Sequence, residues 1–542
     1  MAYTTTLLEF ASEKVITLLL VKERSKCRKH NKTDKKNRLD QECDIYSLSR
    51  RKMLSRMMPP RHTWVRPSKR SRLPNRAADT SKNTIKALLL TIDRDRKLSK
   101  NKGLTFIYLQ ELDAFIERIK KLLANGQVKF DSPHLIPLFK STKIVQGSVS
   151  DVICRPIVIY RRLEDKVIIA LTNLYLTFLV DEYLHENILS YRPPRLFHGQ
   201  ERHITNFNDG IALIKKYYEV KRNEDIYVAD CDIKKFYDII PHSVVLDSFN
   251  RLLKKTSLTY EGKSQVLMVL KAYLDSYDFY TNVLMESQRI PKQYFAKVRC
   301  QLNDIDNVNN YQIEWVDEIM ALPEKERLHR GVPQGGALSL IIANVVLNDV
   351  DQVIVAKEDS NRLFIRYCDD MILMHTSSKE CKRLMNAYTT SLTEHGLYYH
   401  ALEHVSDSKD LKFPEITTKR FWNTKSHYTF KWDFGSGDCN SYIGFLAYEM
   451  RCDGKLRLRK SNVLRFKEKI NRRFYAIRRY KKSDKHSEEE KSQHEKQTLD
   501  QLLAGVNFYK SFQSSHFKQG RQYQYFMKLR TRVEARLAQI DK

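Results

Sequence analysis

Three aspartates lie where apolar runs end, and this context suits them to metal-assisted chemistry. Asp232 closes a strand-like run, and Asp369 and Asp370 sit side by side between two short apolar runs. Buried carboxylates are costly because each loses its hydration and because like charges repel. Two Mg²⁺ ions, or Mn²⁺, would neutralise them and stabilise the attacking and leaving oxygens of a phosphoryl transfer. An isolated Asp-Asp pair usually marks only a turn, so the neighbouring motifs must decide.

The surrounding pattern predicts the elements that position these carboxylates. An apolar run at 226–233 predicts a strand that carries Asp232, and the runs within 363–374 predict a hairpin with the Asp pair at its turn. A strand is expected at 152–160. Helices are expected at 106–123 and 164–190, after the strand at 226–233 through to about 276, at 331–350 after a Gly-rich turn, and beyond Ser441.

Two further segments carry residues that suit nucleotide binding. Arg155 and Arg161 flank an apolar strand, and their guanidinium groups could hold a triphosphate through bidentate hydrogen bonds. Gln334 and Gly335 lie in the segment 330–339, which contains consecutive glycines. Glycines lack a Cβ and let the backbone approach a base pair closely.

Taken in chain order, these motifs resemble those of reverse transcriptases, over about residues 152–480. The matching segments are the Arg-Pro fingers block at 154–169, the block at 190–193, the first palm motif at 232–242, the Pro-Gln-Gly motif at 331–344, the Tyr-x-Asp-Asp hairpin at 367–370 and the primer-grip block at 441–445. The resemblance implies an RNA-templated DNA polymerase. It also implies an α+β right-hand fold with fingers, a palm of antiparallel sheet with helices, and a helical thumb.

The resemblance also implies roles for individual residues. Asp232 and Asp369 should be catalytic and hold both metal ions, with Asp370 assisting. Tyr237, five residues after Asp232, falls where the family keeps an aromatic steric gate against the ribose 2′-hydroxyl. The remaining nucleotide contacts that it implies are Arg155, Arg161, Gln334 and Gly335.

One family feature is missing at its usual place. Family members carry a Lys seven residues after the Gly of a Gly-Leu block, but Glu403 stands there, followed by His404. The general acid for pyrophosphate departure is therefore open: His404 is one candidate, and an ordinary surface histidine is the alternative interpretation. The long separation of Asp232 and Gln334 predicts an insertion at about 279–328.

These motifs divide the chain into five predicted regions. They are a basic N-terminal extension with the start of the fingers at 1–140, fingers at 141–225, a palm with finger elements and the insertion at 226–440, the primer grip and start of the thumb at 441–483, and a helical thumb or C-terminal extension at 484–542.

Composition points to an anionic polymer as partner. The 542 residues include 95 Lys and Arg against 65 Asp and Glu, a formal net charge of +30. A basic stretch at 22–82 is either a solvated arm or a nucleic-acid-binding arm. In the segment 463–477 one apolar stripe runs between basic faces, which is typical of a solvated surface helix or of one that follows a nucleic-acid backbone.

Cysteine usage and hydropathy set further bounds. The nine cysteines form no Cys-x-x-Cys pair, which suits a reducing compartment. Cys27, His30, Cys43 and His62 fit no common zinc spacing. The longest apolar stretch noted, 167–180, is shorter than the ~20 residues of a membrane span. No membrane association is expected.

By exclusion, the sequence resembles the bacterial defence-associated reverse transcriptases, of the unknown-group or abortive-infection type. That implies a cytoplasmic anti-phage enzyme with dNTPs as substrates, a dedicated noncoding RNA as template and a DNA product. A homo-oligomer or a second protein of the same operon would be further partners. The alternatives are a retron-like or intron-maturase-like enzyme, an RNA-binding protein on an inactive polymerase scaffold, and, more remotely, an RNA-templated RNA polymerase.

Overall fold

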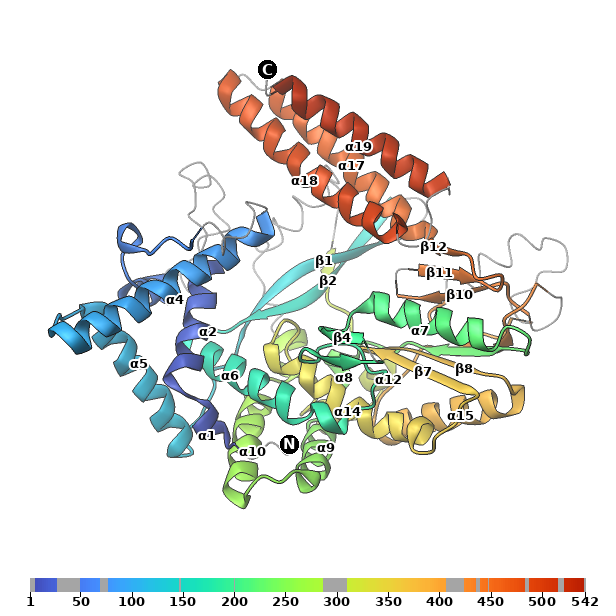
Figure 1. Ribbon diagram of the computed structural model, residues 1–542. Helices are drawn as coiled ribbons and strands as arrows, with labels where there is room; N and C mark the ends of the chain where they lie inside the picture. The colour runs from blue at the N-terminus through green and yellow to red at the C-terminus, as the bar shows by residue number, and fades with distance from the viewer. Residues whose placement is uncertain are drawn as a thin grey trace.

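The computed structural model describes residues 5–26, 49–68, 77–145, 148–198, 200–285, 310–405, 424–434, 439–446, 448–482, 487–514 and 521–540. Helices and sheets are mixed, with N-terminal helices on one side, a central sheet and a C-terminal helical bundle (Figure 1). The predicted α+β class with palm, fingers and thumb is confirmed.

A four-stranded sheet forms the palm, in the order β7-β8-β5-β9. Its strands are β5 (Tyr227–Cys231), β7 (Arg362–Tyr367), β8 (Asp370–His375) and β9 (His427–Lys431). All neighbouring strands run antiparallel, and the β5–β8 ladder ends at the pair Cys231–Met371. The next residues along this register, Asp232 and Asp370, therefore meet at one edge of the sheet. The predicted strand and the predicted hairpin are both confirmed.

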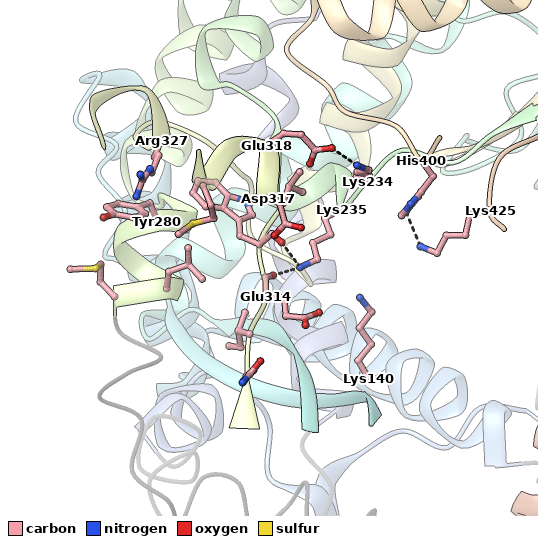
Figure 2. Close-up of a pocket in the computed structure, with 17 residues that line it drawn as sticks. Lys140, Lys234, Lys235, Tyr280, Glu314, Asp317, Glu318, Arg327, His400 and Lys425 are labelled. Atoms are coloured by element: carbon pink, nitrogen blue, oxygen red, sulfur yellow. Dashed lines mark hydrogen bonds and ion pairs between the residues drawn. The ribbon is translucent and has the colours of Figure 1, made fainter. Parts of the chain in front are cut away.

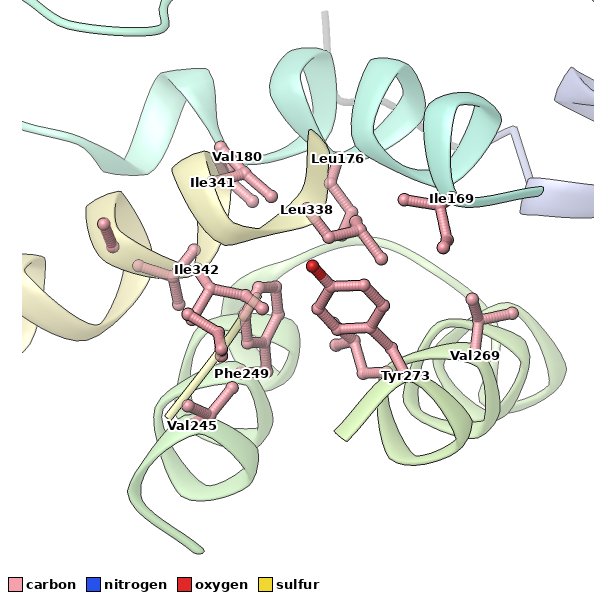
Figure 3. Close-up of a cluster of buried hydrophobic side chains, with 14 of the residues drawn as sticks. Ile169, Leu176, Val180, Val245, Phe249, Val269, Tyr273, Leu338, Ile341 and Ile342 are labelled. Carbon is pink, nitrogen blue, oxygen red and sulfur yellow. The ribbon is translucent and has the colours of Figure 1, made fainter. Parts of the chain in front are cut away.

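Helices on the palm and fingers share one large apolar core (Figure 3). They are α6 (Leu163–Leu179), α9 (His242–Lys255), α10 (Tyr260–Asp275) and α14 (Ala337–Val355), while α15 (Ser378–Glu394) contacts β9, β5 and β8. By length and composition α14 could cross a membrane, but 72% of its apolar window is buried inside the protein. A helix that is apolar on most faces is a core helix when its surroundings bury it.

The predicted helix at 164–190 is too long, because α6 ends at Leu179. Beyond it, Arg192 donates to the carbonyls of His185 and Ile188 at 3.0 and 3.2 Å, and it forms an ion pair with Asp181. This guanidinium pairs main-chain carbonyls that a continued helix would have paired internally, so the chain can leave the helix at little cost.

The fingers are built on a long hairpin of β1 (His134–Val145) and β2 (Ser148–Ile159). A third strand, β6 (Asn310–Gln312), pairs with β2 in parallel, so part of the predicted insertion belongs to the fingers sheet. Its neighbours are the π-helix η5 (Tyr280–Met285), α12 (Asp317–Met320) and α13 (Glu324–Arg327). These parts of the predicted insertion therefore form regular secondary structure. Residues 286–309 lie outside the described residues.

The prediction of helix from Ser441 onward is wrong for its first part. Three short antiparallel strands come first, β10 (Tyr442–Phe445), β11 (Tyr448–Arg451) and β12 (Leu456–Leu458). Alternate residues of β11 and β12 are buried, which is the period of a strand with one covered face. The helices that follow, α17 (Lys460–Lys481), α18 (Glu488–Ser514) and α19 (Arg521–Ile540), pack as a bundle (Figure 1). In α17 the stripe Val463, Phe466, Ile470 and Ile477 is buried, as the spacing predicts.

The N-terminal helices pack beside the fingers. They are α1 (Leu7–Phe10), α2 (Glu13–Lys26), α4 (Ala77–Lys102) and α5 (Ile107–Ala124). Much of the basic stretch 22–82, with Cys27, His30 and Cys43, lies outside the described residues. The remaining elements are η2 (Arg61–Thr63), η4 (Asp181–Tyr183), β3 (Arg195–Phe197), β4 (Gln200–His203), α7 (Phe207–Val220) and α8 (Phe236–Ile239).

Candidate active site

The palm sheet brings two of the three predicted aspartates to one cavity. Asp232 follows β5, and Asp369 lies in the two-residue turn that joins β7 to β8. Both line a cavity of about 320 Å³, which we call the nucleotide cavity. Asp370 opens β8 and, together with Asp232, lines a neighbouring cavity of about 230 Å³. Asp232 is thus common to both.

The charges of these carboxylates oppose one another. Burial and the charge of Asp232 raise the pKa of Asp369. Burial, followed by the charges of Asp369 and Asp232, raises the pKa of Asp370 to about 7. A nearby cation would favour the charged form of a carboxyl group whose pKa is raised in this way.

These side chains fit a divalent metal ion for which solvent and substrate supply most of the ligands. Among the described residues, no three His, Cys, Asp or Glu side chains already converge on one point. Mg²⁺ is commonly held by one or two carboxylates together with waters and substrate phosphates. Asp232 and Asp369 supply those carboxylates at one cavity.

A buried ion pair lies directly behind the turn that joins β7 to β8. Arg366 and Asp351 are both fully buried, and the guanidinium is 2.8 Å from the carboxylate. Arg366 also donates to the main-chain carbonyl of Cys368 at 2.9 Å and to the side-chain oxygen of Asn344 at 3.3 Å. The guanidinium therefore ties α14 to the turn that carries Asp369.

The turn is also held from the fingers side. The main-chain N–H of Cys368 donates to the hydroxyl of Ser190 at 2.8 Å, and Asn344 donates to the carbonyl of Ser190 at 2.9 Å. Cys368 has a φ of 58°, a left-handed conformation that side chains seldom adopt. These bonds offset the cost of that conformation and fix the residue that precedes Asp369.

Three predicted nucleotide contacts join the aspartates in the nucleotide cavity. They are Arg155 from β2, Tyr237 from α8 and Gln334 from the turn before α14. Gln334 is held through its side chain and its main chain: the side-chain amide N–H donates to Asp238 at 2.6 Å, and the main-chain carbonyl accepts from the N–H of Val158 at 3.2 Å.

Two predicted residues lie elsewhere. Arg161 is exposed, and it does not line either cavity. Gly335 is exposed beside the nucleotide cavity, and its φ of 89° favours glycine. The next residue must also be glycine, because a Cβ on Gly336 would lie 2.2 Å from the hydroxyl of Tyr273. Packing against α10, rather than a base pair, requires glycine at position 336.

Sequence reasoning missed three lysines of the nucleotide cavity. Lys140 comes from β1, at the irregularity in the fingers hairpin between Phe139 and Ser141, while Lys235 and Lys425 come from the palm. Burial lowers the pKa of Lys235 to about 8, and burial, Lys425 and Arg155 lower that of Lys140. Cations that crowd one cavity in this way favour an anionic ligand. Of the three, only Lys235 had a sequence signal, because it lies within the first palm motif.

Lys425 lies next to Asp232, one of the predicted metal ligands. Its ammonium is 3.1 Å from Asp232 Oδ2 and 3.1 Å from the ring Nε2 of His400. Glu403 and His404 do not line either cavity, and the His404 ring packs against Tyr428 with centroids 4.5 Å apart. Lys425, rather than His404, is therefore the side chain that lines both cavities and contacts Asp232.

The second cavity lies between the aspartates and the sheet before the thumb. Besides Asp232 and Asp370, its lining includes Gly444 and Phe445 of β10 and Arg459 before α17. Gly444 and Phe445 belong to the block that resembles a primer grip. We call this space the primer cavity.

Comparison with known proteins identifies the domain. Residues 151–401 match the family model described as reverse transcriptase (RNA-dependent DNA polymerase). The match includes all three aspartates with Arg155, Tyr237 and Gln334. The chain therefore carries a reverse transcriptase domain, and its chemistry is RNA-directed DNA polymerisation. No curated protein matches the sequence.

Solved telomerase structures are among those similar to this chain. Apo telomerase from Candida tropicalis shares 11% identity at a TM-score of 0.33, over 98% of this chain and 92% of that one. Telomerase from Candida albicans in complex with a TWJ fragment of telomeric RNA shares 12% identity at a TM-score of 0.31, over 86% of this chain and 70% of that one.

Proposed function

We propose that this chain, an RNA-directed DNA polymerase with its reverse transcriptase domain at 151–401, adds deoxynucleotides by two-metal nucleotidyl transfer at Asp232 and Asp369. The observation that carries the proposal is the nucleotide cavity. It joins both carboxylates to Arg155, Tyr237 and Gln334, which come from separate elements. Mg²⁺, or Mn²⁺ in its place, is the proposed cofactor.

The two reactants would bind on two sides of Asp232, the nucleotide in the nucleotide cavity and the primer end in the primer cavity. In this transfer the primer 3′ oxygen bonds to the α-phosphorus of the nucleotide while the bond to pyrophosphate breaks. Cations held by Asp232 and Asp369 would supply positive charge to both oxygens. Arg155, Lys140 and Lys235 neutralise the triphosphate, and Gln334 positions the nucleotide. The primer end occupies the primer cavity, beside Asp370.

Tyr237 sets the preference for deoxyribose. Its ring shares the nucleotide cavity with Asp232 and packs edge-on against Phe236, with centroids 5.3 Å apart. Tyr237→Ala should therefore admit ribonucleotides by removing a clash, with discrimination falling roughly 10- to 100-fold. Single-nucleotide insertion kinetics with dGTP and GTP measure this ratio. Equal use of both sugars by the unmodified enzyme would contradict the assignment.

We further propose that the template is a dedicated noncoding RNA and that the enzyme acts in bacterial anti-phage defence in the cytoplasm. The support is electrostatic: the chain carries a net charge of +30. The basic residues on the exposed side of α17 include Arg465, Lys469, Arg472, Arg478 and Arg479. A surface of this kind binds phosphate backbones through counterion release.

Sequencing the nucleic acid that copurifies from the native host tests this proposal. We expect one dominant small RNA together with DNA complementary to it. The Asp232→Asn protein is the matched control, since it should retain the RNA and lack the DNA. A broad sample of cellular transcripts would contradict a dedicated template, and an intron or retron RNA would favour the maturase-like or retron-like alternative.

A further inference from the structure

A third and larger cavity, of about 860 Å³, opens beside the nucleotide cavity (Figure 2). The two share four lining residues, Lys140, Lys235, Glu314 and Lys425, so they are continuous. Residues of η5, β6 and α12 line its outer wall. We call it the outer cavity.

Cations line the outer cavity from its inner end to its rim. Lys140 of β1 lines both the outer cavity and the nucleotide cavity. Lys235 donates to the main-chain carbonyls of Glu314 and Trp315, the latter at 3.2 Å. Near the rim, Lys234 forms an ion pair with Glu318 of α12 (Figure 2). The inner end sets Lys140, Lys235 and Lys425 against one carboxylate, Glu314, and is therefore positive. Farther out, Asp317 and Glu318 lie among Lys234 and Arg327.

The aromatic residues of the outer cavity leave little room for a stacked base. Tyr280 lies between Trp315, with ring centroids 6.2 Å apart, and the guanidinium of Arg327, 5.7 Å from its ring centre. Trp315 is itself buried, and its indole N–H donates to the carbonyl of Asp238 at 2.9 Å. Because these rings pack against each other, we expect the lysines at the inner end, rather than the aromatic residues, to bind a ligand. Such a group of cations favours a small, highly charged anion.

Three cavities are joined at a single residue. Lys425 lines the primer cavity, the nucleotide cavity and the outer cavity. The primer cavity contains Asp370 and the β10 residues, whereas the outer cavity contains neither. A leaving group displaced from the nucleotide cavity, away from the primer, therefore meets the outer cavity.

We propose that the outer cavity binds inorganic pyrophosphate and is the route by which it leaves after each addition. This inference rests on the proposed function, because pyrophosphate is the product of that reaction. Lys140 and Lys235 receive the anion from the metal ligands, and Lys234 guides it at the rim. Glu318 limits how tightly the anion is held by neutralising Lys234.

Substituting each partner of the Lys234–Glu318 ion pair should change pyrophosphate affinity in opposite directions. Lys234→Gln leaves Glu318 unpaired and should weaken pyrophosphate binding, whereas Glu318→Gln frees Lys234 and should strengthen it. Each change should be about two- to fivefold at low salt, because exposed charge pairs contribute little. Both changes should shrink with added salt. Isothermal titration of the full chain with sodium pyrophosphate, with divalent metal removed by chelation, measures the dissociation constants.

The two substitutions break the same ion pair, so a structural effect of losing it would move both dissociation constants in one direction. Such a result, or no change in either, would overturn the proposal. Arg383→Gln, in an exposed ion pair with Glu380 on α15, is the control and should have no effect. If Lys234→Gln fails to fold, Arg327→Gln replaces it and should also weaken binding.

Product inhibition of primer extension by pyrophosphate provides the second readout, and its inhibition constant should follow the same order. Charge-dependent binding in a protein that adds no nucleotide would refute the proposed function and leave the anion site standing. Normal extension with pyrophosphate binding indifferent to both substitutions would refute the anion site alone.

Discussion

Replacing Asp232 with Asn is expected to abolish nucleotide addition while the fold remains intact. The carboxylate faces both the nucleotide cavity and the primer cavity, so its loss removes a metal ligand that serves both reacting groups. We expect the rate of addition to fall by at least ~10³-fold, or about 4 kcal/mol of transition-state stabilisation. Single-turnover extension of a labelled primer measures this rate, and circular dichroism checks the fold.

Asp247→Asn is the matched control for that experiment. This aspartate is exposed on α9, away from all three cavities, so its substitution should leave the rate unchanged. Asp369→Asn should behave like Asp232→Asn, because both carboxylates line the nucleotide cavity. An Asp232→Asn enzyme that extends primers at near the unmodified rate would show that the metal ligands are wrongly assigned.

Replacing Asp351 with Ala is expected to produce the largest loss of stability. Arg366 and Asp351 have no exposed side-chain surface, so the substitution leaves a buried guanidinium without its counter-charge. Breaking such a pair costs about 3–5 kcal/mol in free energy of unfolding. Denaturant unfolding of the full chain, followed by circular dichroism, measures the loss. Activity should fall as well, because Arg366 holds the carbonyl of Cys368 beside Asp369.

Two comparisons separate the buried charge from general damage. Glu380→Ala removes an exposed carboxylate that pairs with Arg383, and it should cost less than about 1 kcal/mol. Replacing the whole buried pair with Asp351→Leu and Arg366→Met should recover much of the stability, because no charge is then left unpaired. If Asp351→Ala proved as mild as Glu380→Ala, the turn would not depend on the buried pair.

The palm could be predicted from the sequence because its strands are short, apolar and bounded by acids. The runs around Asp232 and Asp369 leave few alternatives to strands that end at a charged edge, and β5 and the β7–β8 hairpin follow them closely. The apolar stripe of α17 was equally predictable, because a spacing of apolar residues near 3.6 indicates a helix regardless of what the helix packs against.

Other features depend on contacts between distant segments, and no local pattern reports them. Lys140 and Lys425 are ordinary surface lysines in the sequence and gain a role only because the fingers hairpin and the palm place them at one cavity. Strand β6 is three residues long and exists by pairing with β2. The end of α6 at Leu179 depends on carbonyl contacts from Arg192, more than ten residues away.

Copying of a defined RNA template is the most direct test of the central claim. The purified chain, supplied with an RNA template of mixed sequence, an annealed primer, Mg²⁺ and all four dNTPs, should yield DNA whose sequence is complementary to that RNA. Asp369→Asn protein purified in parallel excludes a contaminating polymerase and should yield none. Template-complementary DNA from the unmodified protein alone is the predicted result. Equal product from both proteins, or no template-dependent product from either, would contradict the account.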